Sequence, residues 1–379
     1  MQRELGLRYG MNPHQAPARV FVQDGTLPIS VLNGAPGFIN LLDALTAWQL
    51  VREVAQATGL PTAASFKHTA PAGVAVGLPL SPELAEAVRA ADLELSPVGA
   101  AYARARGADR QASFGDFAAF STTVDLSAAR MLAREVSDGV IAPGYDADAL
   151  AVLQKKKGGK YLVLGIDPAF SPPATERREV FGITFEQPRN DATVTMGEVV
   201  TARTDLPEAA QRDLLIAAIT LKYTPSNSIA LAVGGQAIGV GAGQQSRILC
   251  TRLACSKAEL WWLRQHPRTL SLQYAAGVSR SERDNGVEAW LRQEPTTALL
   301  DPPAPLSDAE RAGWISQLRG VALASDGLIP FRDNVDRAAQ TGVGYIWQPG
   351  GSTRLDEVLS AADEHGMVMT CSGLRLFHH

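Results

Sequence analysis

The sequence predicts an α/β protein organised in two halves. Helix and strand signals alternate along the chain, a pattern typical of helices layered against a sheet. The 379 residues suffice for two packed domains, and 46% hydrophobic with 20% charged residues is ordinary for a globular protein. Proline and charge are enriched at about 167–193, so we place one domain at 1–185 and the second at 186–379.

The first predicted elements are a helix and a strand. Asn40 can cap a helix whose apolar face begins at Leu41, and Gly59 followed by Pro61 ends it. The run that follows, residues 61–66, is apolar and rich in small side chains, which predicts a buried strand.

Capping residues predict two more helices in the first half. Ser81–Pro82 opens one of them, with proline at the first helical position. Asp146 can cap a helical segment over 149–154, which runs into Lys155–Lys157 before two glycines stop it. Lysines are favourable at a helix C-terminus, so they have a structural explanation as well as a functional one. Residues 161–165 predict a strand.

The second half begins again with a helix, over 207–221. Two short apolar runs within 229–240 are joined by two glycines and predict a hairpin. A capping box, Ser307 with Glu310, opens a helix that we expect to extend over 307–318.

Composition excludes several classes of protein. A net charge of −4 argues against a general surface for nucleic acid or anionic membranes. The N-terminus lacks an apolar signal core, and no stretch approaches the roughly 20 apolar residues of a membrane helix. The three cysteines form no CxxC pair, which suits a reducing compartment, so we expect a cytoplasmic protein. No P-loop occurs, and the glycines at 239–243 lack dinucleotide-binding spacing.

The segment Ser65–Gly73 is the strongest functional signal in the chain. Lys67 and His68 lie side by side where the predicted strand gives way to a loop. A lysine there can donate to a developing oxyanion, and a histidine can accept a proton near neutral pH. Taken alone, the pair also fits a solvated lysine beside a histidine with a purely structural role.

Nine segments, from Leu7 to the last residue, carry a family resemblance. They are LRYGMNPHQ (7–15), LNGAPGFINLLDALTAWQLV (32–51), SFKHTAPAG (65–73), RGADRQASFGDF (106–117), REVSDGVIAPGY (134–145), KYTPSNS (222–228), GAGQQSRILCTRLA (241–254), PFRDNVDRA (330–338) and LRLFHH (374–379). In this order they resemble the AICAR transformylases, the folate-dependent half of the bifunctional purine enzyme that makes IMP.

The resemblance implies a fold and a reaction. The fold would be two cytidine-deaminase-like three-layer domains in tandem, with a small helical insertion near 280–318. The reaction would move a formyl group from 10-formyltetrahydrofolate to the 5-amino group of AICAR, in a homodimer with composite sites. We expect no zinc, because the H-x-E and P-C-x-x-C ligands of deaminases are absent. A cyclohydrolase domain precedes the match in bifunctional relatives, and we expect this chain to carry the transfer step alone.

The resemblance also assigns site residues. His68 would be the base, Lys67 the oxyanion donor, and Asn227 an amide that orients both reactants. The residues implied on the AICAR side are Arg8 and Arg375 as a phosphate clamp, Tyr9, Asn40, Phe114, Gly115, Asp138, Arg247 and Leu328. Those implied on the folate side are Lys157, Ser246, Ile248, Asn285, Pro330 and Asp333, with Asp333 as a buried acid facing the pterin. The resemblance also implies a monovalent cation such as potassium near Thr224, Ser226 and Asp326.

The chain departs from the family pattern in two places. Leu328–Ile329 stands where two phenylalanines are common, and Ser372–Gly373 precedes Leu374 where an asparagine is usual. Two other functions stay open beside formyl transfer to AICAR. One is a paralogous formyltransferase acting on a different phosphorylated aminoimidazole, and the other is a non-catalytic folate- or nucleotide-binding module.

Overall fold

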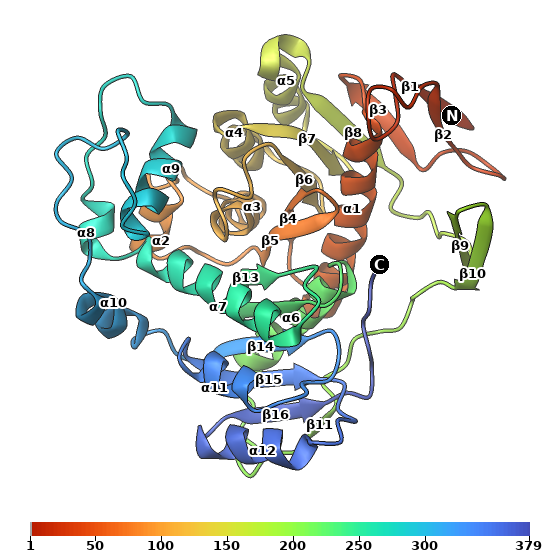
Figure 1. Ribbon diagram of the computed structural model, residues 1–379. Coiled ribbons are helices and arrows are strands. Elements are labelled where there is room, and N and C mark those ends of the chain that lie inside the picture. The colour runs from red at the N-terminus through yellow and green to blue at the C-terminus, as the bar shows by residue number, and fades with distance from the viewer. Residues whose placement is uncertain (1) are drawn as a thin grey trace.

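A computed structural model describes residues 2–379, and its described residues are built around one mixed sheet of twelve strands (Figure 1). The strands of the first half are β3 (Ile29–Asn33), β4 (Thr62–Lys67), β5 (Ala70–Val76), β6 (Asp116–Phe120), β7 (Ser137–Ala142) and β8 (Leu162–Ile166). Those of the second half are β11 (Glu198–Val199), β12 (Ile229–Val233), β13 (Gln236–Gly241), β14 (Val321–Ser325), β15 (Val343–Gln348) and β16 (Val368–Cys371).

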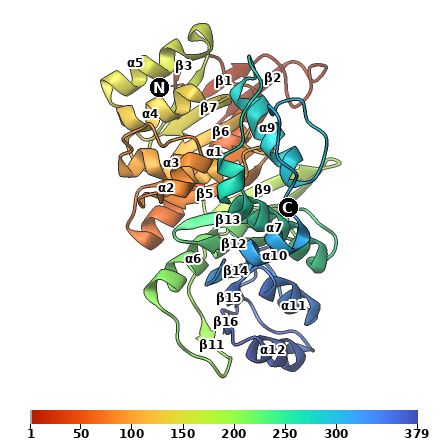
Figure 2. The ribbon, with the colours of Figure 1, turned by 90° about the vertical axis from the view of Figure 1, so that its left-hand side faces the viewer.

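The two halves repeat one topology, which the residues themselves do not reveal. The strand order is β3-β8-β7-β6-β4-β5 in the first half and β11-β16-β15-β14-β12-β13 in the second, each read from its outer edge inward. Each half has a hairpin (β4–β5, β12–β13), three parallel strands and an antiparallel outer strand. The halves join where β5 and β13 pair antiparallel, with Gln236 opposite Ala75. The sheet is therefore continuous through both halves (Figure 2). The repeated strand order and the antiparallel join relate the halves by a pseudo-two-fold axis.

Helices cover both faces of the sheet and make three layers. One face carries α1 (Phe38–Thr58) and α6 (Glu208–Lys222), whose apolar residues pack on side chains such as Phe66 and Phe117. The other face carries α3 (Pro97–Gly107), α4 (Leu126–Arg134), α5 (Ala147–Lys155), α7 (Arg247–Leu263), α11 (Asp333–Ala339) and α12 (Leu355–Glu364). Successive residues of a strand thus point to opposite faces and pack in two separate cores, as expected for strands that are buried on both sides.

Most predicted helix boundaries agree with the structure, but the start of α1 needs a correction. Ser81 caps α2 (Pro82–Ala87) through Leu84 N–H, and Gly59 ends α1 in the left-handed conformation. The cap of α1 is Gly37 and not Asn40. Asn40 is the third helical residue, and its Oδ1 accepts a hydrogen bond of 3.0 Å from Gly37 N–H, because a side chain there can reach back to the cap.

A helical insertion separates α7 from β14. It comprises α8 (Pro267–Leu270), α9 (Arg280–Leu291) and α10 (Asp308–Ile315), and it has a small core of its own that includes Trp290. The capping box at Ser307 opens α10 as predicted, but the helix ends at Ile315 and not at 318. Its end tightens into three-residue turns, in which Leu318 N–H binds the Ile315 carbonyl.

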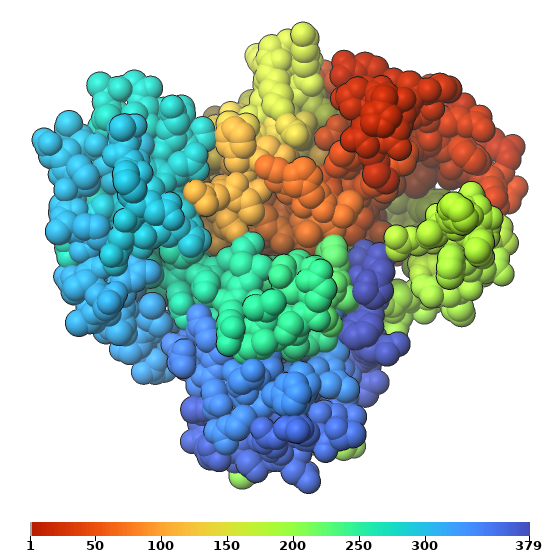
Figure 3. Space-filling view, in the orientation of Figure 1, coloured from red at the N-terminus to blue at the C-terminus, as the bar shows by residue number. Residues whose placement is uncertain are grey.

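Two small hairpins stand outside the large sheet. β1 (Glu4–Leu7) pairs with β2 (Ala18–Phe21), and β9 (Thr175–Val180) pairs with β10 (Ile183–Pro188). The second hairpin lies in the proline-rich segment where the boundary between the halves is predicted, and it protrudes from the body of the molecule (Figure 3). Its strands are exposed on both faces, so no buried pattern marks them in the sequence. Across residues 2–379, no helix combines the length and apolarity that a membrane span requires.

Candidate functional site

The Lys-His motif ends strand β4 and turns the chain into β5. Lys67 pairs with Ala70, so His68 and Thr69 form the two-residue turn of the hairpin. The φ angles of His68 and Thr69 are 53° and 60°, in a region that favours glycine. Such residues cost on the order of 1–3 kcal/mol each and persist where surrounding contacts fix them. His68 is exposed and Lys67 is half-buried, so both side chains are accessible where β4 ends and β5 begins.

A buried carboxylate holds this turn from beneath. Oδ1 of Asp43, on α1, accepts a hydrogen bond of 2.6 Å from Thr69 N–H, and Asp43 is 6% exposed. Burial raises the pKa of Asp43, while the bond from Thr69 and the charge of His68 act in the opposite direction. Sequence reasoning missed Asp43, although a single acid inside the apolar run 41–45 was a signal that could have found it.

Four of the expected ligand-binding residues gather around Lys67. Lys67 Nζ donates to the carbonyl oxygen of Phe114 and lies 5.8 Å from the centre of its ring. A Cβ on Gly115 would lie 4.0 Å from Lys67 Nζ and 3.9 Å from Asp138 Oδ2. Lys157 Nζ lies 2.8 Å from Asp138 Oδ1, so Lys157, expected on the folate side, joins the residues expected near the ribose.

Buried charges fix the loop in front of β6, which carries Phe114 and Gly115. Ser65 donates through Oγ to Asp116 Oδ2 over 2.7 Å. Arg106 lies 3.4 Å from Asp116 and 3.1 Å from Glu135, all three buried. Burial alone would raise the pKa of Glu135, but Arg110, Arg106 and a third arginine outweigh it and hold that pKa well below its ordinary value.

A second group forms around Asn227, directly before β12. Arg247 Nη2 donates to Asn227 Oδ1 over 2.9 Å, and Asn227 Nδ2 donates to the Gln244 carbonyl over 3.1 Å. Arg247 Nη1 binds Asp326, and Arg247 is 8% exposed. The guanidinium of Arg247 is therefore held inside the protein, where its Nη2 orients Asn227, while its Nε has no hydrogen-bond partner among the described residues.

The residues expected at a cation site come together only in part. Ser226 Oγ donates to Asp326 Oδ2 over 2.6 Å. Thr224 instead donates through Oγ1 to the Thr220 carbonyl over 2.7 Å, which turns it back toward α6. Asp326 already balances its charge with Arg247. Among residues 2–379, no group of three or more His, Cys, Asp or Glu side chains is placed to hold a metal ion.

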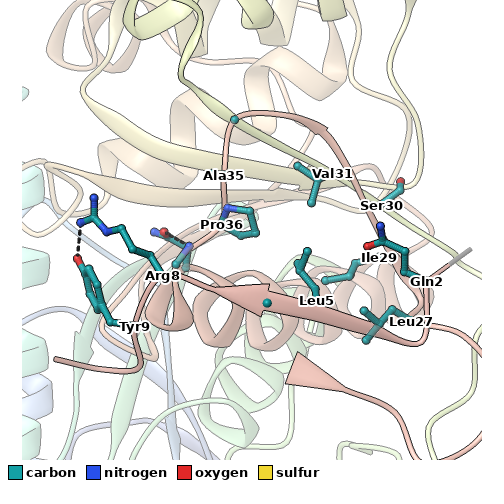
Figure 4. A pocket seen from close by; sticks show the side chains of 14 residues that line it. Gln2, Leu5, Arg8, Tyr9, Leu27, Ile29, Ser30, Val31, Ala35 and Pro36 are labelled. Carbon is teal, nitrogen blue, oxygen red and sulfur yellow. Dashed lines mark hydrogen bonds between the residues drawn. The ribbon is translucent and has the colours of Figure 1, made fainter. Parts of the chain in front are cut away.

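Arg8, Tyr9 and Asn40 line one cavity of about 770 Å³ between β1 and the loop that enters α1. Figure 4 shows Arg8 and Tyr9 at one end of it, where Arg8 Nη2 donates to the Tyr9 hydroxyl over 3.2 Å. Arg375 is the expected second half of the phosphate clamp. Its guanidinium carbon lies over the Phe377 ring, 4.7 Å from the ring centre. Within the described residues, no hydrogen bond or ring contact joins Arg8 to Arg375.

Apart from Lys157, the folate-side residues lie at three helices, α7, α9 and α11. Asn285, on α9, accepts a hydrogen bond of 3.4 Å from Gln111. Asp333 was expected to be buried, but it is exposed in the first turn of α11, where Asn334 Nδ2 donates to it over 2.8 Å. Ser246 and Ile248 lie at the start of α7, and Pro330 lies just before α11. Leu328, which was expected on the AICAR side, also lies just before α11.

The groups around Lys67 and Asn227 lie at the same side of the sheet, where β4 ends and β12 begins, but they do not touch. Ile229 lies opposite Gly241, and β13 runs antiparallel to β5, so Asn227 and the His68 turn project from the same edge. Strands β5 and β13 separate β4 from β12, which puts Lys67 and Asn227 three strand spacings apart, or about 14 Å. Within residues 2–379, no hydrogen bond or ion pair joins Lys67 to Asn227.

Comparison with known proteins identifies the family. Residues 1–257 match the AICARFT/IMPCHase bienzyme. The bifunctional purine biosynthesis protein PurH of Sorangium cellulosum is 33% identical over 391 residues, which cover 100% of this chain and 59% of that protein. The protein of the same name from Magnetococcus marinus is 33% identical over 383 residues, covering 99% and 59% respectively. The chain spans about 59% of the length of these relatives, and it belongs to the AICARFT/IMPCHase bienzyme family.

Proposed function

We propose that this chain transfers a formyl group from 10-formyltetrahydrofolate to the 5-amino group of AICAR, giving formyl-AICAR and tetrahydrofolate in purine biosynthesis. The observation that carries the proposal is the His68–Thr69 turn, which holds a base and a cationic donor side by side at an exposed sheet edge. Family membership supplies the reaction class.

The chemistry needs both groups. The AICAR amine is a poor nucleophile, because its lone pair is delocalised into the imidazole ring and the carboxamide. The nitrogen of the AICAR amine bonds to the formyl carbon, and His68 accepts the proton that this nitrogen loses. Lys67 donates to the oxyanion of the tetrahedral intermediate. The bond from the formyl carbon to N10 of the folate then breaks, and N10 takes up a proton.

The surrounding residues supply binding. Asp138 and Gly115 lie beside Lys67 and suit the ribose and the base, and Gly115 lets a ligand approach the backbone. Arg8, with Tyr9 and Asn40 in the 770 Å³ cavity, suits the phosphate dianion. We assign the folate to the exposed groups near Asn285, Pro330 and Asp333, and a potassium ion near Ser226 remains part of the proposal.

Two features support a homodimer with composite sites. Lys67 and Asn227 are about 14 Å apart along the edge of one chain, farther than one reacting carbon can bridge. Arg8 and Arg375 have no contact in the described part of one chain. A second copy would bring the missing group to each site. We further propose that residues 1–185 and 186–379 are deaminase-like domains, in line with their repeated strand order.

One departure from the family pattern keeps a second acceptor as an alternative to AICAR. Leu328, which is 40% exposed, replaces an aromatic residue of the family pattern, so a different phosphorylated aminoimidazole could be the acceptor. The test is the absorbance change on mixing the protein with 10-formyltetrahydrofolate and AICAR, compared with AICAR analogues. Turnover with an analogue alone would select the paralogue. Binding of both ligands without turnover would select a non-catalytic module.

A further inference from the structure

The internal repeat places a buried aspartate at the same point of both halves. Asp43 is the sixth residue of α1, and Asp213 is the sixth residue of α6. Each helix directly precedes the hairpin of its half, and each aspartate binds backbone N–H groups of that hairpin's turn. Asp43 accepts from Thr69 at 2.6 Å, and Asp213 accepts from Gly234 and Gly235 at 2.7 Å each.

The two turns share a backbone shape but not a sequence. Gly234 and Gly235 have φ angles of 59° and 82°, which glycine adopts without a steric penalty. The first half has His68 and Thr69 at comparable angles, and a β-branched threonine is an outlier there. The glycine turn therefore adopts this shape without strain. The His68–Thr69 turn holds the same shape with strained residues, and its bond to Asp43 is a contact that fixes it.

We propose that Asp43 is a positioning residue, whose carboxylate fixes the His68–Thr69 turn so that the imidazole of His68 meets the acceptor amine. This rests on the formyl transfer proposed above. Asp43 itself touches no substrate, because it is 6% exposed beneath the turn. Its partner in the second half, Asp213, is 3% exposed and makes the matching contact far from any Lys-His pair.

The matched pair Asp43→Ala and Asp213→Ala tests this assignment. Both variants lose a buried acceptor for a turn, so both should lower the melting temperature. Only Asp43→Ala should lower kcat, by about 100-fold, because a misplacement of about 1 Å is enough for such a loss. The KM for AICAR should stay within roughly threefold, since the binding groups are unaffected. Asp213→Ala should keep kcat within roughly threefold of the wild type.

Asp43→Asn provides the rescue. Its Oδ1 can still accept from Thr69 N–H, so kcat should return to within about tenfold of the wild type. If Asp43→Ala does not fold, Asp43→Ser takes its place, because serine is too short to reach the turn. Equal kcat for the Asp43 and Asp213 alanine variants, or no recovery in Asp43→Asn, would overturn the positioning role. Absence of formyl transfer by the wild type would instead refute the proposed function.

Discussion

Arg247 donates a hydrogen bond of 2.9 Å from Nη2 to Oδ1 of Asn227, while its Nη1 holds the buried Asp326. This contact orients the Asn227 amide. Its oxygen is occupied, one of its N–H groups points to the Gln244 carbonyl, and one donor remains for a ligand. The second-half group therefore offers a neutral donor whose direction is set by a buried ion pair.

Asn227→Asp should lower kcat by roughly 10²–10³-fold, because the free donor is replaced by a carboxylate that repels a developing oxyanion. Stability should change little, since Arg247 pairs with a carboxylate at least as well as with an amide. Steady-state kinetics and a melting curve measure both effects. The exposed substitution Asn190→Asp is the control. Wild-type kcat in Asn227→Asp would remove Asn227 from the site.

Lys67→Ala and His68→Ala should each lower turnover by about 10²–10⁴-fold while leaving AICAR binding largely intact. The reason is that each removes one group acting in the transition state, whereas the binding groups lie on other elements. Turnover and calorimetric titration with AICAR separate the two effects. Lys155→Ala, at the exposed end of α5, should behave as the wild type. Unchanged kcat in either motif variant would contradict the assignment.

Local signals predicted much of the fold, and long-range relationships escaped them. The hairpin over 229–240 and the capping box at Ser307 depend on neighbouring residues, and the structure has both. The repeat of the two halves was invisible, because it preserves topology and a buried aspartate on α1 and α6 but not the surrounding residues. The Lys-His pair was found because its two chemical groups are adjacent. Asp43 was missed because only the fold brings it beneath Thr69.

Glu135 predicts how stability depends on acid. It is 4% exposed and lies within 3.3 Å of Arg106, Arg110 and Arg280, and its pKa is lowered from the ordinary 4.5. A lowered folded-state pKa contributes stability above pH 4.5 that is lost as the pH falls toward that lowered value. Glu135→Gln should cost about 3–5 kcal/mol at pH 7, as for a broken buried pair.

The same variant should also lose less stability than the wild type between about pH 5 and pH 3, because the titrating group is gone. Urea unfolding at several pH values measures both effects, with the exposed Glu294→Gln as control. Equal acid sensitivity of Glu135→Gln and the wild type would show that other carboxylates control the acid transition.

Purified protein should contain no stoichiometric zinc, and chelators should leave turnover unchanged. The sequence lacks the H-x-E and P-C-x-x-C ligands, and Cys250 and Cys255 both lie on α7, five residues apart. Elemental analysis of the isolated protein and an assay after dialysis against EDTA provide the check. One tightly held zinc per chain would refute this expectation.

A complementation experiment tests the composite site. If His68 of one chain works with Asn227 of another, a dimer of a His68→Ala chain with an Asn227→Ala chain holds one site with both residues and one with neither. Each variant alone should be nearly inactive. Random mixing makes half of the dimers mixed, with one of two sites restored, so activity should recover to roughly a quarter of the wild type.

The geometry gives this experiment a clear opposite outcome. Within one chain, β5 and β13 hold Lys67 and Asn227 about 14 Å apart, and these strands pair at Gln236 and Ala75, near the other edge of the sheet. To close that distance within one chain, the two halves of the sheet would have to move relative to each other. A second chain needs only to dock against the side of the sheet where Lys67 and Asn227 lie. Sedimentation at assay concentration establishes the oligomeric state. An active monomer, or stable mixed dimers without recovered activity, would return both groups to a single chain.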